Sequence, residues 1–158
     1  MISAEYLRCM GLYNRWQNDL LYAHCAKLSD DQRTADQGMF FRSIHHTLDH
    51  IALIDDVLLD VVRKGTKTEQ DLTRIRIADF VELRSYRTTL DEEIQELWLQ
   101  FDTRWLSLKA SPKFRFSRGF QLTQMFNHQT HHRSQVTSQL LRLGIDYGTT
   151  DLPACPYL

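Results

Sequence analysis

The sequence predicts an all-α protein built as a four-helix bundle, with short connections and a C-terminal extension. Four long segments carry apolar residues three or four positions apart, the spacing that places side chains on one face of a helix. Only three prolines occur, all in the last third of the 158 residues, so most of the chain lacks the strongest helix breaker. Nothing marks a second domain, and we expect one helical domain over residues 1–158.

The first predicted helix spans residues 3–27. Ser3 is a typical N-cap, because its hydroxyl oxygen can accept a hydrogen bond from a backbone N–H of the first turn. The polar segment 29–32, Ser-Asp-Asp-Gln, has the form of a capping box and predicts a short helix after it. The apolar stripe of the first helix contains Tyr6, Met10, Tyr13, Leu20 and His24.

The second and third long helices are predicted over residues 39–64 and 77–106. Gly65 suits the end of the second helix, because glycine readily adopts the left-handed conformation found there. Arg63 and Lys64 suit the negative end of the same helix. The third helix is marked by apolar residues at three- or four-residue spacing, namely Phe80, Leu83, Tyr86, Leu90, Ile94, Leu97 and Phe101.

The fourth long helix is predicted over residues 120–143 and ends at Gly144. The preceding segment, 109–119, contains Pro112 and mixes basic with aromatic residues, so we predict a loop or hairpin there. Residues 145–158 hold two clusters of glycine or proline. We expect them to form an ordered extension that lies on the body of the bundle.

Composition and charge narrow the class of protein. Apolar residues make up 42% and charged residues 25%, which is ordinary for a globular domain. The net charge of −1 argues against a general nucleic-acid binder, which is usually clearly basic. No apolar run approaches the roughly 18–20 residues that span a bilayer, and the first five residues do not begin a signal peptide. We therefore expect a cytoplasmic protein with no membrane or nucleic-acid partner.

The three cysteines fit the same compartment. Cys9, Cys25 and Cys155 are odd in number, far apart and without a Cys-x-x-Cys pair. This is not a disulfide framework, and it is typical of a reducing environment. Cys9 and Cys25 lie in an apolar helical segment and are expected in the core, whereas Cys155 lies in the C-terminal extension.

The most informative feature is a pair of histidines four residues apart, His128 and His132, in the segment NHQTHHRSQ at 127–135. Residues four apart lie one above the other on a helix, so two imidazoles from consecutive turns can bind one metal ion. On a helical wheel the pair lies at the edge of the apolar stripe, whereas His131 points away from it. The segment lacks the glutamate of a His-Glu-x-x-His motif, which argues against a zincin-type hydrolase.

A second histidine-rich segment lies at residues 44–50, in the second long helix. His50 falls inside the apolar stripe of that helix, and His46 shares its face one turn earlier. His45 falls on the opposite side, so we expect it to face solvent. A transition metal needs a further ligand besides the pair in the fourth helix, and His50 can supply it if the two helices meet.

Two interpretations of this trio of histidines stay open. A single inward histidine is usually a hydrogen-bonded core residue, and this applies to His24 and His46. Three imidazoles in one apolar layer would cost several kcal/mol of burial energy without a partner, and a shared cation removes that cost. The sequence therefore predicts that His50, His128 and His132 bind one metal ion.

The sequence also offers residues that can support such a site. Gln135 and Asp56 can orient metal ligands through hydrogen bonds without binding the metal themselves. Asp49 and Asp55 lie off the face of His50 and are expected to be solvated. Four basic residues precede the fourth helix, and they either receive an anionic substrate or belong to a solvated loop with packed aromatics. They are Lys109, Lys113, Arg115 and Arg118.

Nearly the whole chain resembles the DinB/YfiT family of metal-dependent four-helix proteins. The similarity is carried by the segments 13–18 (YNRWQN), 41–51 (FRSIHHTLDHI), 127–135 and 150–153 (TDLP). It implies metal ligation by His50, His128 and His132, and it implies homodimers. Ser134 stands where the family often has glycine, and His46 where a small residue is common, which leaves open a fourth histidine near the metal.

The resemblance and the ligand set together suggest a class of chemistry. Three imidazoles leave a divalent metal with open positions, as in catalytic rather than structural sites. Imidazole suits several metals, and zinc or nickel is expected before iron. Some members of the family resemble transferases or isomerases that use low-molecular-weight thiols, so we expect a small-molecule substrate, a thiol being the candidate, in a thiol-dependent transferase or a hydrolase.

Other functions remain as alternatives. The first is a non-catalytic metal-binding stress-response protein, induced by damage, in which the ion mainly holds helices together. The second is a helical interaction module with buried neutral histidines. Binding to DNA finds no support in the charge balance.

Overall fold

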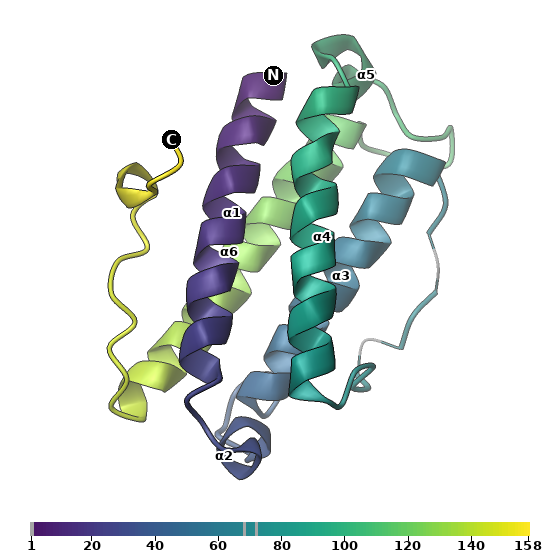
Figure 1. Ribbon diagram of the computed structural model, residues 1–158. Helices are drawn as coiled ribbons and strands as arrows, with labels where there is room; N and C mark the ends of the chain where they lie inside the picture. Colours follow the sequence, from purple (N-terminus) through teal and green to yellow (C-terminus); the bar gives the residue numbers. More distant parts are fainter. Residues whose placement is uncertain (1, 68, 72) are drawn as a thin grey trace.

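The computed structural model describes residues 2–67, 69–71 and 73–158. Over these residues the chain is helical, with two isolated β-bridges, which confirms the all-α prediction (Figure 1). The long helices are α1 (Ala4–Cys25), α3 (Ile44–Lys64), α4 (Phe80–Gln100) and α6 (Arg118–Arg142). The short elements are α2 (Asp30–Thr34), α5 (Thr103–Ser107) and the 3-10 helix η1 (Leu152–Ala154).

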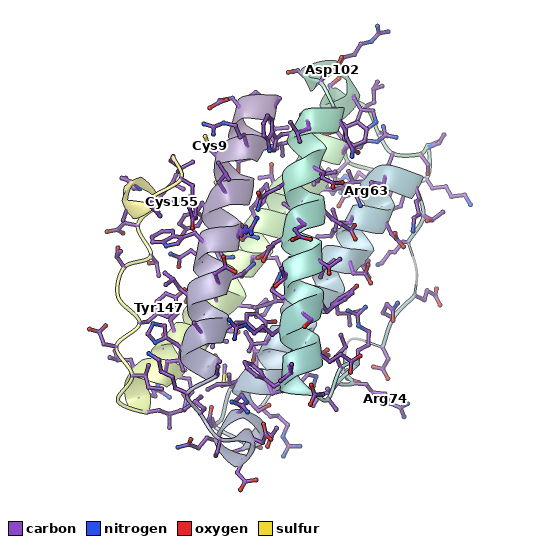
Figure 2. The ribbon with its side chains drawn as sticks, viewed as in Figure 1. Cys9, Arg63, Arg74, Asp102, Tyr147 and Cys155 are labelled. Carbon is purple, nitrogen blue, oxygen red and sulfur yellow. The ribbon has the colours of Figure 1, made fainter. Side chains whose placement is uncertain are left out.

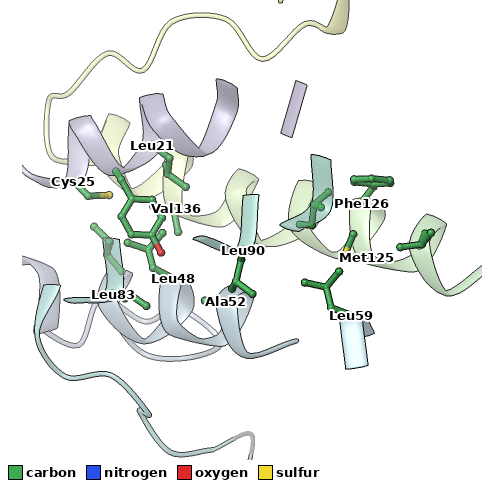
Figure 3. Close-up of a cluster of buried hydrophobic side chains, with 14 of the residues drawn as sticks. Leu21, Cys25, Leu48, Ala52, Leu59, Leu83, Leu90, Met125, Phe126 and Val136 are labelled. Atoms are coloured by element: carbon green, nitrogen blue, oxygen red, sulfur yellow. The ribbon is translucent and has the colours of Figure 1, made fainter. Parts of the chain in front are cut away.

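The long helices pack side by side around one apolar core (Figure 1). α1 and α4 run antiparallel, and α3 and α6 form the second antiparallel pair. Each helix contributes almost fully buried apolar side chains, among them Leu21, Leu48, Leu83 and Met125 (Figure 3). Burial of these faces is the main stabilising term, because most helical stability in proteins comes from packing an amphipathic face. In the described part of the chain, no helix has the length and apolar character needed to cross a membrane.

Side chains cap the helix ends, as the sequence predicts. Ser3 Oγ accepts a hydrogen bond of 3.1 Å from the backbone N–H of Tyr6. Ser29 and Gln32 form the predicted capping box, in which each side chain accepts from the backbone N–H of the other. Gly65 ends α3 with φ of 68°, the left-handed conformation expected there. Each N-cap is worth about 1 kcal/mol, so these contacts define where the helices begin.

The second predicted helix began too early, at residue 39. α3 begins at Ile44, because Ser43 is its N-cap and accepts from the backbone N–H of His46 at 3.1 Å. The residues before the cap form a tight turn, closed by a 2.8 Å hydrogen bond from the Arg42 N–H to the Met39 carbonyl. Arg42 has φ of 66°, which is unusual for a residue other than glycine.

The third predicted helix, 77–106, is divided in the structure. α4 ends at Gln100, and Phe101 is extended with φ of −130°. Asp102 then caps α5 by accepting from the Trp105 N–H at 2.8 Å (Figure 2). The apolar spacing in the sequence continues across this break, which is why a single helix was predicted. Phe101 and Trp105 still pack against the core, and their ring centroids are 3.6 Å apart.

The C-terminal extension lies on the body of the bundle, as predicted, and runs along α1 (Figure 1). The Tyr13 hydroxyl donates to the Thr150 carbonyl at 2.6 Å, and the buried Tyr147 hydroxyl donates to the Gln17 carbonyl at 2.9 Å. The predicted hairpin before α6 is also present, closed by an antiparallel bridge between Lys109 and Ser117. The extension therefore attaches to α1 through polar contacts.

All three cysteines are free thiols, and their burial differs. Cys25 lies in the apolar core, as predicted. The same prediction was wrong for Cys9, which is only half-buried on α1 and whose Sγ lies 3.6 Å from the exposed carboxylate of Glu5. Cys155 lies on the extension and is buried there (Figure 2).

A buried ion cluster joins α3 to α4. Arg87 donates to Asp55 at 2.5 Å and to Asp91 at 3.1 Å, and all three side chains are almost fully buried. The prediction that Asp55 is solvated was wrong, because the helical wheel of α3 could not show that Arg87 of another helix faces it. Burial raises the pKa of Asp55 to about 7, although Arg87 acts in the opposite direction. Burial also raises the pKa of Asp91.

Asp49 was likewise predicted to be solvated, and it is fully buried. Its carboxylate accepts the backbone N–H of Arg76 at 2.8 Å and that of Ile77 at 3.0 Å. His45, also expected in solvent, is buried, and its Nε2 lies 2.8 Å from the Ile77 carbonyl. Both side chains therefore fasten the connection between α3 and α4 to the start of α3.

We expect Arg87→Met to lower the free energy of unfolding by about 3–5 kcal/mol at pH 8, because it leaves buried carboxylates without a cation. The loss should be smaller at pH 5. Without Arg87 the pKa of Asp55 rises further, so the folded variant holds a proton that the unfolded chain releases, and its stability increases as the pH falls. Urea denaturation at both pH values measures this.

The matched control is Lys64→Met, which removes an exposed ion pair with Asp60 on α3. Its cost should stay below about 1 kcal/mol at either pH. An equal, small loss for both variants would show that the buried cluster does not stabilise the bundle.

Candidate metal centre

Three histidines from two helices converge beside the core. His50 lies on α3, and His128 and His132 lie on consecutive turns of α6. One nitrogen from each ring can be chosen so that all three lie within 4.8 Å of one another. The sequence predicted this trio, and the antiparallel packing of α3 against α6 brings it together.

The spacing of the nitrogens fits a single ion. The Nε2 atoms of His50 and His128 are 3.1 Å apart. Two nitrogens bound tetrahedrally to one zinc at 2.0–2.1 Å would be about 3.3 Å apart. The ring centroids of His128 and His132 are 4.4 Å apart, and those of His50 and His132 are 4.9 Å apart. The three rings are therefore close enough to hold one metal ion.

Gln135 fixes the tautomer of His132. Its Oε1 lies 2.8 Å from His132 Nδ1. A carbonyl oxygen can only accept, so Nδ1 carries the proton and Nε2 keeps a free lone pair. In the described part of the chain, Nδ1 of His50 and Nδ1 of His128 are buried and have no hydrogen-bond partner. This contact is compatible with the prediction that Gln135 orients a metal ligand, here His132, through a hydrogen bond.

Burial keeps the trio uncharged at neutral pH. It lowers the pKa of His50 to about 4, helped by the nearby His132 and His46. It lowers the pKa of His128 to about 3, with His132 and His50 as the next causes. Burial also lowers the pKa of His132. Neutral imidazole is the form that binds metals, so no proton has to leave before an ion enters at pH 7.

An aromatic turn forms one wall of the site. The Phe41 ring stacks on His50 with centroids 3.9 Å apart and also lies 5.5 Å from His132. Next to it Phe40 is 80% exposed. A cavity of about 500 Å³ opens beside these rings, lined by Phe40, Phe41, His50, Thr73, His131, His132 and Gln135. His50 and His132 therefore face a space that can admit a small molecule.

The other candidate residues lie outside the trio. His131 is exposed, as predicted, and lines the cavity. His46 packs near Phe41, with centroids 5.4 Å apart, and does not join the metal-binding group among the described residues. His24 packs against Tyr147 of the C-terminal extension, with ring centroids 5.4 Å apart. Asp56 pairs with Arg76 at 2.8 Å, so the prediction that it orients a ligand finds no contact to support it.

The basic segment before α6 lies at the other end of α3 from the histidines. Arg118 Nε donates to the Val62 carbonyl at 3.0 Å. Val62 comes twelve residues after His50, which is about 18 Å along a helix axis. None of Lys109, Lys113, Arg115 or Arg118 lines the cavity. This favours the interpretation of the segment as a surface loop.

Sequence reasoning missed the two phenylalanines of the turn. Phe40 and Phe41 fell inside the predicted second helix and carried no polar signal. Two residues beside them could have indicated the turn. Gly38 is a typical turn residue and Ser43 a typical N-cap, and together they mark a short loop before α3.

Comparison with known proteins identifies a family. The model of the DinB family matches residues 4–158, essentially the whole chain. A search of curated proteins found no match. The family match covers every helix described above and both histidine segments, and the chain therefore belongs to the DinB family.

Proposed function

We propose that His50, His128 and His132 bind one divalent transition metal, and that the protein is a metal-dependent enzyme acting on small molecules. The observation that carries this proposal is the convergence of three neutral imidazoles, within 4.8 Å of one another, beside a cavity of about 500 Å³. Structural zinc sites usually have four protein ligands, whereas three ligands and an open position are typical of catalysis. Imidazole suits zinc, nickel, iron and copper, and we propose zinc or nickel before iron.

The proposed reaction is transfer of a low-molecular-weight thiol to an electrophile, with hydrolysis as the related alternative. When bound, such a metal lowers the pKa of a thiol or a water and makes it nucleophilic near neutral pH. In the transfer a sulfur–carbon bond forms, the leaving group departs with its electron pair, and the thiol proton passes to solvent. Gln135 holds the tautomer of His132, and Phe41 shields His50 from water. A homodimer and a cytoplasmic location stay predictions.

A second candidate is a non-catalytic metal-binding stress-response protein. It is favoured by the position of the trio, because an ion held by α3 and α6 would cross-link two helices that already pack closely. In this case metal removal should lower the melting temperature strongly, and thiols should leave the spectrum of cobalt-loaded protein unchanged. A thiol-dependent change in that spectrum supports the enzyme instead.

Protein purified without a histidine tag should contain about one transition-metal ion per chain, as three nitrogen ligands at one centre require. His128→Ala should lose most of this metal, because two imidazoles remain. The matched control is His131→Ala, which removes the neighbouring exposed histidine and should keep the ion. Elemental analysis of the three proteins decides, and full metal content in His128→Ala would contradict the proposal.

Gln135→Leu should weaken metal binding about 10–100-fold, the usual effect of removing the group behind a histidine ligand. The fold should survive, because Gln135 is only half-buried. Competition with a chromophoric chelator measures the affinity. Gln139→Leu, one turn further along α6, is the control and should bind metal as the unaltered protein does. Equal metal affinities for the two variants would show that Gln135 does not support the metal site.

A further inference from the structure

A second cavity adjoins the one beside the histidines. It has a volume of about 300 Å³ and lies between the last turns of α6 and the turn before α3. Phe40 and Gln135 line both cavities, so the two spaces meet at these side chains. A molecule bound at the histidines can therefore extend along α6 without leaving the protein surface.

The two cavities differ in chemistry. Beside the histidines, the wall that does not belong to the trio is mainly aromatic, from Phe40 and Phe41. The second cavity is lined by hydroxyl, amide and guanidinium groups, including those of Ser134, Ser138 and Arg142. These three residues are four apart and share one face of α6. Within the described ranges of the chain, no carboxylate lines this cavity.

Arg142 is available to an external anion. Among the described residues, its side chain is exposed and forms no ion pair or hydrogen bond. Arg42 on the facing turn differs, because it is paired with Asp36 at 2.8 Å. An exposed guanidinium beside hydroxyl groups is suited to a carboxylate, which it can bind through two parallel hydrogen bonds.

The length of the site limits the ligand. Arg142 follows His132 by ten residues, a rise of about 15 Å along the helix axis. A helical side chain points back toward the N-terminus, which brings the guanidinium closer to the histidines. A tripeptide-sized molecule spans about 10 Å at 3.3–3.6 Å per residue. Cysteine alone is too short to reach from the histidine trio to Arg142.

We propose that the second cavity binds the polar, carboxylate-bearing end of a tripeptide-sized thiol, with Arg142 as the carboxylate anchor. This rests on the proposed function, since the thiol sulfur is directed to the metal. Ser134 and Ser138 offer hydrogen bonds to the amide or hydroxyl groups of the same molecule. An apolar electrophile would then bind against the aromatic rings of Phe40 and Phe41 in the cavity beside the histidines. Arg142 is a binding residue in this arrangement and takes no part in the chemical step.

The test uses cobalt-loaded protein titrated with two thiols, glutathione and 2-mercaptoethanol, and follows the visible absorption of the metal. Glutathione carries carboxylates several bonds from its sulfur, whereas 2-mercaptoethanol carries none. Arg142→Gln should weaken glutathione binding about tenfold, the loss of one hydrogen-bonded ion contact. It should leave the binding of 2-mercaptoethanol unchanged. Lys113→Gln, in the basic loop before α6, is the matched control and should alter neither affinity.

Ser138→Leu is the second variant, because a leucine there fills the polar cavity and leaves the Arg142 residue itself in place. It should also weaken glutathione binding and spare 2-mercaptoethanol. If both thiols change the spectrum and neither variant alters glutathione affinity, the second cavity is not the thiol subsite, although the proposed enzyme stands. If neither thiol changes the spectrum of the unaltered protein, the thiol chemistry itself is overturned, and this inference with it.

Discussion

The rotation of α6 about its own axis is the constraint on which the site depends. His128 and His132 reach His50 only if this face of α6 turns toward α3. The residues that follow them, Gln129 and Arg133, point about 100° further round and toward α1. There Arg133 donates to Asn14 and to Gln129, and Asn18 donates to Asp91 at 2.9 Å. The same two turns of α6 thus present imidazoles to one neighbour and hydrogen-bonding groups to another.

The hydrogen bonds of Arg133 and Asn18 explain why polar side chains that are costly to bury can remain beside the core. A guanidinium and several amides beside the apolar core lower the free energy of the fold only if their hydrogen bonds are made. Their geometry is directional, whereas leucine packing tolerates small rotations of a helix. The contacts from Arg133 and Asn18 therefore hold the angle of α6 more tightly than the apolar core alone. Asp91 joins these contacts to the cluster around Arg87, because it accepts hydrogen bonds from both Arg87 and Asn18.

Much of the fold could be predicted from periodicity and caps, because each depends on residues close in sequence. Ser3, Ser29 and Gly65 have their predicted roles, and the trio of His50, His128 and His132 follows from two helical faces. The three errors about the burial of polar side chains share one cause. His45, Asp49 and Asp55 are buried by partners from distant segments, namely a backbone carbonyl, two backbone N–H groups and Arg87. A helical wheel gives the direction of a side chain and says nothing about what meets it there. The turn that places Phe41 on His50 was not predicted, for a related reason. Its hydrogen bonds are made by backbone groups, which leave no pattern of side chains in the sequence.

The central claim is that imidazoles from α3 and α6 share one ion and leave a coordination position facing the cavity. Anomalous diffraction from crystals of zinc-loaded protein tests it most directly. The account predicts one peak, about 2.0–2.1 Å from a nitrogen of each of His50, His128 and His132, with no fourth protein ligand. A peak elsewhere on the chain, or a fourth side chain closing the coordination sphere, would contradict it.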